Sequence, residues 1–311
     1  MKLSQVTLCC IDNQFPDQGF YALLKSTRSI TFEKTLFFTS SSFVEPKHDI
    51  SNCEIKYVDH LTSIDTYSRF LLKELGQYIE TSHVLIVQWD GFIIDPSKWS
   101  DSFLACDYVG APWDGCDEML VGNGGFSLRS KKLMNALREI SVEVYHPEDD
   151  VICKQLRPLL EEKFDIQFSP VDLAKEFSFE TIKPVSKTFG FHGLFNLPIV
   201  LNENDLKDFV NSITPPILFH GHWAFFYQNC LSLGNQKILS AIEYKILDVI
   251  KEADLFLVSK PMYRSLVKSC LFNKKFHLAK IALSKKIELL GWSFDSFILL
   301  IRIYLKLLTK N

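Results

Sequence analysis

The sequence predicts an α/β fold with a mostly parallel central sheet, followed by a helical C-terminal region. Four short apolar runs, separated by helical or loop segments, predict the strands: Val6–Ile11, Thr35–Thr39, Ile55–Val58 and His83–Val87. From about Asn229 onward the pattern is helical and almost free of turn residues. We therefore expect a domain boundary near Tyr227, with residues 1–227 as the α/β domain and 228–311 as the helical region.

Three helices are expected within the α/β domain. Large apolar residues recur at helical spacing between Phe70 and Ile79, which predicts a helix over Asp65–Glu80, beside the strand that begins at His83. Similar spacing predicts helices over Ser130–Ile140 and Pro147–Phe164.

The composition excludes several classes of protein. With 47% hydrophobic residues in 311, the chain can fill a sizeable core, and 34 Lys+Arg against 37 Asp+Glu leave a net charge of −3. That charge lacks the basic field of a non-specific nucleic-acid binder, so no nucleic-acid partner is expected. The eight cysteines show no CxxC or zinc-type spacing and are expected to be reduced and mostly buried. The N-terminus lacks the apolar run of a secretory signal, so we expect a cytoplasmic protein.

The last apolar segment, Ser293–Lys310, is too short and too interrupted by charge to span a membrane, which needs about 20 residues. Arg302, Lys306 and Lys310 are spaced by four, so they form a cationic stripe opposite a broad apolar face. This pattern fits two structures: a terminal helix packed on its own domain, or a helix lying on the inner face of an anionic membrane.

The segment QWDG directly follows the strand predicted at His83–Val87 and places Asp90 at its carboxyl end, where ligands bind in open α/β sheets. A carboxylate there can hold Mg²⁺ or Mn²⁺, which take oxygen ligands and share them with phosphates. The alternative is an Asp-Gly turn that only closes the strand.

The turn VGNGG offers a second candidate. Gly122, Gly124 and Gly125 allow close approach of the backbone to a sugar or phosphate, and Asn123 tolerates unusual dihedral angles. The turn has neither the GxGxxG order nor a GK[ST] ending, so it is neither a Rossmann fingerprint nor a P-loop. A structural turn before the helix expected at Ser130 is the alternative.

The acidic box PEDD also has two interpretations. Pro147 suits the first turn of a helix, and Glu148, Asp149 and Asp150 suit the positive end of its dipole. One of these carboxylates can also face a cleft and act as general base, with Asp149 the first choice and Asp150 the second.

Histidines occur in two suggestive places. His192 lies in FGFHG, where the glycines suit a turn that lines a ligand, and neutral imidazole is a common metal ligand. His220 and His222, in FHGHW, would face the same side of a strand and compete for that role.

Taken in order, five boxes between about Tyr67 and Gly193 resemble a poorly characterised family of GT-A-type glycosyltransferase-like proteins, common in bacterial surface-glycan loci. The boxes are QWD, DYVGAPW (Asp107–Trp113), VGNGGFSLRS (Val121–Ser130), PEDDVIC (Pro147–Cys153) and FGFHG (Phe189–Gly193). The resemblance implies a GT-A-like nucleotide-sugar-binding domain. In it, Asp90 is the last acidic residue of a DxD-type metal motif, and Gln88 replaces the first acidic residue.

The resemblance further implies transfer of a sugar from a nucleotide donor, expected to be UDP-linked, to a glycan or lipid-linked acceptor in polysaccharide biosynthesis. Asp90 and His192, favoured over His220 and His222, would hold Mn²⁺ or Mg²⁺ as a Lewis acid for the departing diphosphate. A carboxylate of PEDD would be the base, and inversion is expected, although retention stays open.

The remaining substrate contacts are assigned less directly. The glycine turn and Trp113 would shape the sugar pocket, and Asp107 would contact donor or acceptor unless it has a structural role at a strand end. Asp12, after the first strand, is a candidate for the nucleobase site, and Arg69 for phosphate or a solvated helix surface. The oligomeric state is open.

Two other functions remain possible on the sequence alone. A nucleotidyl or phosphoryl transferase would use the same metal and carboxylate chemistry, although the sequence has no P-loop. A non-catalytic carbohydrate-binding or scaffold protein would keep the fold, and the presence of Gln88 in place of an acidic residue keeps that alternative open.

Overall fold

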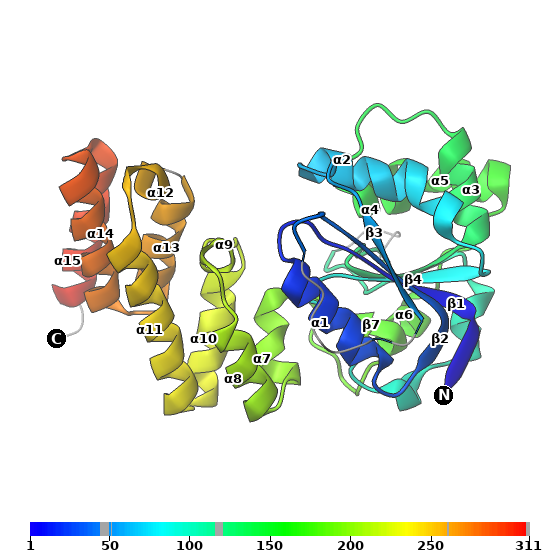
Figure 1. The fold of residues 1–311 in the computed structure, drawn as a ribbon, viewed down its shortest axis with the longest axis horizontal. Helices are drawn as coiled ribbons and strands as arrows, with labels where there is room; N and C mark the ends of the chain where they lie inside the picture. Colours follow the sequence, from blue (N-terminus) through cyan, green and yellow to red (C-terminus); the bar gives the residue numbers. More distant parts are fainter. Residues whose placement is uncertain (44–49, 51, 116–120, 260, 309–311) are drawn as a thin grey trace. The chain divides into compact units, whose positions relative to one another are not determined.

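The chain forms two compact units, Met1–Gly193 and Leu194–Asn311 (Figure 1). The computed structural model describes residues 1–311 except 44–49, 51, 116–120, 260 and 309–311. Helices α8 (Glu203–Asn211) and α10 (Trp223–Leu233) contact α11 (Gln236–Glu252), so they belong to the second unit. The boundary expected near Tyr227 therefore falls inside α10.

The first unit is built on a six-stranded sheet in the order β3-β2-β1-β4-β6-β5. The strands are β1 (Lys2–Ile11), β2 (Thr31–Thr39), β3 (Cys53–Tyr57), β4 (His83–Val87), β5 (Tyr108–Val109) and β6 (Phe126–Ser130). The first four are parallel, which confirms the predicted mixed α/β fold with a mainly parallel sheet. Strand β6 runs antiparallel to β4, where the sequence predicts only a glycine-rich turn that leads into the helix at Ser130.

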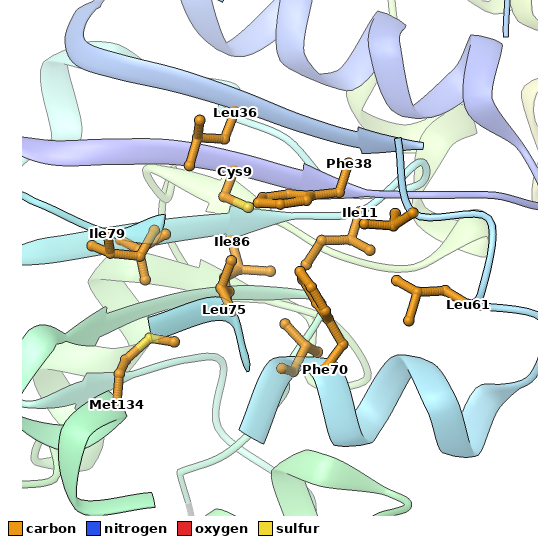
Figure 2. Close-up of a cluster of buried hydrophobic side chains, with 13 residues drawn as sticks. Cys9, Ile11, Leu36, Phe38, Leu61, Phe70, Leu75, Ile79, Ile86 and Met134 are labelled. Carbon is orange, nitrogen blue, oxygen red and sulfur yellow. The ribbon is translucent and has the colours of Figure 1, made fainter. Parts of the chain in front are cut away.

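Both faces of the sheet are covered, because consecutive strand residues point to opposite sides. On β2, Phe37 packs against Phe20 of α1 (Pro16–Thr27), whereas Phe38 packs against Phe70 on the other face. Figure 2 shows the second of these layers, with Cys9, Leu36 and Ile86 also in the buried cluster. This burial on two faces explains the apolar runs of β1, β2 and β4, whereas β3, at the edge of the sheet, is only partly buried.

Two of the three predicted helices are divided. The expected helix over Asp65–Glu80 consists of α2 (Ile64–Arg69), a π-helical turn (Phe70–Glu74) and a 3₁₀ turn (Leu75–Tyr78). The expected helix over Pro147–Phe164 consists of α4 (Glu148–Asp150), a π-helical turn (Val151–Gln155) and α5 (Arg157–Phe164). Pro158 has no N–H to donate to the preceding turn, which accounts for the second division.

The third predicted helix is continuous. Helix α3 (Lys131–Glu139) begins after Ser130, whose Oγ accepts a hydrogen bond from the backbone N of Leu133 at 3.0 Å. Ser130 thus ends β6 and caps α3, which fixes the exit of the chain from the sheet.

Smaller elements complete the first unit. Helix α6 (Val171–Phe177) leads into β7 (Ser178–Phe179), which pairs in parallel with β8 (Gly190–Phe191). Short 3₁₀ turns occupy Pro96–Lys98 and Asp101–Ala105.

The second unit is helical throughout its described residues apart from its connections, as predicted for the C-terminal region. Besides α8, α10 and α11 it contains α7 (Leu197–Val200), α9 (Pro215–Leu218), α12 (Leu255–Ser259), α13 (Pro261–Phe272), α14 (Phe276–Leu290) and α15 (Phe294–Leu308), with a 3₁₀ turn at Leu194–Asn196. Among the described residues, no helix combines the length and apolar content required to cross a bilayer. Arg302 and Lys306 are exposed on α15, and Lys310 lies outside the described residues.

Candidate functional site

The sheet brings QWDG and the glycine turn to one edge. Val87 at the end of β4 pairs with Phe126 at the start of the antiparallel β6. Gln88 and Asp90 follow β4, while Gly124 and Gly125 precede β6, so the two segments emerge side by side. Their proximity depends on the strand that the sequence did not reveal.

His192 reaches the same edge through the small sheet of β7 and β8. A bridge joins Ile93 to Gly190, and the backbone N of Gly193 donates to the carbonyl oxygen of Asp90 at 3.0 Å. Because β7 and β8 are parallel and in register, the residues after them, Glu180 and His192, also lie side by side.

The His192 ring is held at both nitrogens. Its Nε2 lies 3.1 Å from Gln88 Oε1 and 3.2 Å from Asp90 Oδ1, and its Nδ1 lies 3.1 Å from Glu180 Oε1. Burial opposes the charged imidazolium, but the carboxylates of Asp90 and Glu180 outweigh it and raise the pKa of His192 well above its usual value. The ring therefore joins two acidic side chains from distant parts of the chain.

A pocket of about 190 Å³ lies in front of this cluster. Its lining residues are Ile64, Tyr67, Gln88, Asn123, Gly124, Gly125, His146, Pro147, Glu148, Asp149, Glu180 and His192. Asp90 does not line the pocket but contacts His192, which does, and Asp149 lines it directly. The structure thus gathers Asp90, His192 and Asp149 at one site.

The three carboxylates of PEDD have different partners. Glu148 forms a buried ion pair with Arg129 Nη2 at 2.9 Å; burial raises the pKa of Glu148, and Arg129 opposes that rise. Asp150 pairs with Lys154 at 2.9 Å and does not line the pocket. Asp149 Oδ2 accepts from the backbone N of Gly124 at 3.1 Å, and no Lys or Arg pairs with Asp149 among the described residues. Of the three, Asp149 has the position and the freedom to act on a bound molecule.

The glycines of the turn make room for the protein's own side chains. A Cβ on Gly122 would collide with Trp113, one on Gly124 with Glu148, and one on Gly125 with His192. The close approach expected toward a ligand is therefore also an approach toward residues that build the site.

Asn123 has the unusual backbone predicted for it, with φ of 66°. Its Oδ1 accepts from the backbone N of Gly125 at 3.1 Å, while its buried Nδ2 has no hydrogen-bond partner among the described residues. A buried amide donor at a pocket wall is available to a ligand acceptor.

Asp107 and Trp113, which are predicted to contact the substrate, contact other residues of the protein instead. Asp107 Oδ1 accepts from Ser130 Oγ, and its Oδ2 accepts from the backbone N of Gln167 at 2.8 Å. Trp113 packs in the core cluster behind Gly122, with Lys154 Nζ at 4.2 Å from its ring centroid. Neither residue lines the pocket.

The predicted nucleobase and phosphate residues also lie outside the pocket. Asp12 Oδ1 accepts from the backbone N of Gln14 at 2.8 Å and of Phe15 at 2.5 Å, at the start of α1. The pKa of Asp12 is raised to about 7, because burial and, to a lesser extent, the charge of Asp90 outweigh the lowering by the two hydrogen bonds. Arg69, on α2, has its guanidinium 6.0 Å from the ring centroid of Tyr145.

The competing histidines lie in the second unit. The segment FHGHW forms a turn before α10 rather than a strand, and the backbone N of His222 donates to His220 Nδ1 at 3.3 Å. Their ring centroids are 5.4 Å apart, and His222 packs against Phe195. His192 is therefore the histidine that the structure places beside Asp90.

Besides Ile64, three lining residues with polar side chains were not predicted from the sequence. Glu180 binds His192, Tyr67 OH accepts from Gln88 Nε2 at 2.7 Å, and His146 Nδ1 lies 3.2 Å from Ser68 Oγ. This hydrogen bond from Gln88 to Tyr67 orients the Gln88 amide so that its oxygen faces His192. Only the position of Glu180 at the end of the apolar segment FSFE offered a sequence signal.

The groups around His192 Nε2 fit a divalent ion if the Gln88 amide is counted. Within the described part of the chain, no three His, Cys, Asp or Glu side chains gather in a group that could hold a metal. Gln88 Oε1, Asp90 Oδ1 and His192 Nε2 nevertheless converge, and amide, carboxylate and imidazole ligands suit Mg²⁺ or Mn²⁺. A carboxylate on the second imidazole nitrogen, here Glu180, usually orients a ligating histidine.

Comparison with known proteins gives one family match. The model of a family described as "Protein of unknown function (DUF5672)" matches residues 51–192, which include Asp90, Asp149 and His192. No curated protein matches the chain. Among solved structures, the mannosyltransferase PcManGT from Pyrobaculum calidifontis, in complex with GDP-Man and Mn²⁺, is similar over 92% of this chain and 87% of its own, with 10% sequence identity and a TM-score of 0.37.

Proposed function

We propose that this chain is a glycosyltransferase that moves a sugar from a nucleotide donor, with UDP the expected nucleotide, to a hydroxyl of a glycan or lipid-linked acceptor. One observation carries the proposal. Gln88, Asp90 and His192 form a compact group beside a pocket that Asp149 also lines. Groups suited to a cation, beside a carboxylate that lines the same pocket, are what transfer from a diphosphate to a hydroxyl requires.

The donor would be bound at the His192 side of the pocket. Gln88 Oε1, Asp90 Oδ1 and His192 Nε2 would hold Mn²⁺ or Mg²⁺, which when bound supplies positive charge to a departing diphosphate. Glu180 keeps the imidazole oriented by its contact with Nδ1. The amide Nδ2 of Asn123 offers a donor to an oxygen of the bound nucleotide or sugar.

Asp149 is proposed as the general base. The backbone N of Gly124 donates to its Oδ2, and the backbone N of Asp150 donates to its Oδ1 at 3.0 Å, so the carboxylate is oriented without losing its charge. It would take the proton from the acceptor hydroxyl as that oxygen bonds to the anomeric carbon and the bond to the diphosphate breaks. Attack from the side opposite the leaving group gives inversion.

Calorimetry tests the donor site. UDP and GDP are titrated into the full chain with and without Mn²⁺, and we expect nucleotide binding that EDTA removes and Mn²⁺ restores. Asp90→Asn should lose this metal-dependent binding. Nucleotide binding that is identical with and without Mn²⁺, and unaffected by Asp90→Asn, would contradict the metal site.

Turnover tests the base. Nucleotide release is measured with a panel of UDP- and GDP-sugars and candidate acceptors. Asp149→Asn should keep donor binding and lower turnover by about 10²–10⁴-fold, whereas its neighbour Asp150→Asn, outside the pocket, should behave as wild type. Tight glycan binding without turnover would instead favour a non-catalytic binding protein, and ATP consumption without sugar transfer a phosphoryl transferase.

A further inference from the structure

The last described helix presents an apolar face outward. Ser296, Leu299 and Ile303 are buried and form the side of α15 that packs on α14; the two helices lie side by side at the C-terminal end of the second unit (Figure 1). At helical spacing, the opposite side carries large apolar residues that are exposed. We call them, with the preceding Trp292, the α15 face: Trp292, Phe294, Phe297, Ile301, Tyr304 and Leu305.

The exposure of this face is large. Phe294 is 81% exposed, Trp292 64% and Leu305 56%. A contiguous apolar surface of this kind marks an interaction site, whereas single exposed apolar residues are normal. Aromatic residues dominate the α15 face, and their rings suit the boundary between water and a lipid bilayer.

Charge indicates the kind of partner. Arg302 and Lys306 are exposed and lie along one edge of the α15 face, one turn apart. Asp295 is the one acidic residue of α15, and its carboxylate is bonded to Arg264 at 2.7 Å and to Lys286 at 2.9 Å. Arg302 and Lys306 therefore place positive charge along this edge, which is complementary to a partner with an anionic surface.

We propose that the α15 face docks on an anionic lipid surface, with α15 lying in the plane of the interface. The apolar and aromatic side chains would enter the boundary between headgroups and acyl chains, while Arg302 and Lys306 bind anionic headgroups. A second copy of the chain fits less well, because two α15 faces packed together would bring like charges to one interface, and Asp295 is already bonded to Arg264 and Lys286. This inference is independent of the function proposed for the first unit.

Vesicle co-sedimentation of the full chain tests the proposal. We compare vesicles of phosphatidylcholine with vesicles that also contain phosphatidylglycerol, and expect stronger binding to the second, weakened by salt. Arg302→Gln/Lys306→Gln should reduce partition onto the anionic vesicles by roughly fivefold per charge. Phe297→Gln/Ile301→Gln/Leu305→Gln should reduce it by at least about tenfold.

Matched controls test whether vesicle binding depends on the α15 face or on exposed side chains in general. Tyr244→Gln/Leu247→Gln removes exposed apolar side chains of α11 in the same unit, and Lys237→Gln/Lys251→Gln removes two exposed cations there. Both controls should bind vesicles as wild type does, and circular dichroism checks that every variant is folded. Absence of binding to either vesicle, equal binding by face and control variants, or a lipid-free dimer that the triple Gln variant dissociates would each overturn the proposal.

Discussion

Adding one methyl group at Gly125 should displace the central histidine of the site. Gly125 immediately precedes β6 and lies against His192, so an alanine Cβ built there would be 2.2 Å from His192 Nε2. Real Cβ atoms essentially never approach another heavy atom within 3.0 Å. The ring or the turn must therefore move by about 0.8 Å, the difference between these two distances.

That movement would break two contacts of His192 Nε2. The distances from Nε2 to Gln88 Oε1 and Asp90 Oδ1 are 3.1 and 3.2 Å, so a shift of this size takes both beyond hydrogen-bond range if the ring moves away from them. Hydrogen bonds to charged groups contribute about 1.5–3 kcal/mol each. With partial relaxation we expect Gly125→Ala to destabilise the protein by about 2–4 kcal/mol. This lowers the thermal midpoint by roughly 5–15 °C for a unit of this size.

Differential scanning fluorimetry measures the stability change, and calorimetry with Mn²⁺ and UDP measures the effect on binding. Gly115→Ala is the matched control, because a Cβ at Gly115 would meet no heavy atom of the described structure within 4 Å. We expect Gly125→Ala to lose both stability and metal-dependent binding, and the control to lose neither. If the two alanine variants have the same midpoint and affinity, the packing of Gly125 on His192 is not what positions the ring.

Two further substitutions test the groups behind the pocket. Glu180→Gln removes the charge beside His192 Nδ1 and should weaken Mn²⁺ binding, measured by calorimetry, by about 10–100-fold. The control Glu176→Gln changes an exposed carboxylate and should leave Mn²⁺ binding unchanged. Equal Mn²⁺ affinities of the two variants would contradict a supporting role for Glu180. Arg129→Met leaves the buried carboxylate of Glu148 unpaired and should lower the free energy of unfolding in urea by about 3–5 kcal/mol. The double variant Arg129→Met/Glu148→Met should recover part of that loss; a double variant no more stable than the single one would show that the loss comes from packing.

The parallel part of the sheet was predictable because burial on both faces leaves a direct trace in the sequence. The four apolar runs correspond to β1, β2, β3 and β4, and the helices beside them show apolar residues at helical spacing. Strand β6 leaves no such trace. Its sequence FSLRS contains Arg129, which is fully buried only because Glu148, distant in sequence, neutralises it. A charged residue in a short polar segment argues against a buried strand until its partner is known.

The site was predictable only in part, for a related reason. Asp90 follows β4, whose apolar run predicts a strand, so its position at a strand end could be estimated from the sequence. The glycine turn precedes β6, so its position beside Asp90 could not. Glu180 depends on β7 and β8, which have two residues each and are too short to produce a pattern. Asp107 and Trp113 lie in boxes of the same resemblance, yet they join strands and helices behind the pocket. The presence of a residue in one of these boxes therefore did not show whether it lines the pocket or packs behind it.

The glycine turn both lines the pocket and makes room for the side chains that build the site. Glycine permits close approach of any neighbour, and the sequence does not say whether that neighbour is a ligand or a side chain. Here the missing Cβ of Gly124 makes room for Glu148, and that of Gly125 makes room for His192, while the backbone N of Gly124 orients Asp149. The turn thus sets the separation between the proposed cation group and the proposed base. Asn123 also lines the pocket, and its buried Nδ2 has no hydrogen-bond partner among the described residues. This amide donor is therefore the part of the turn best placed to contact a substrate.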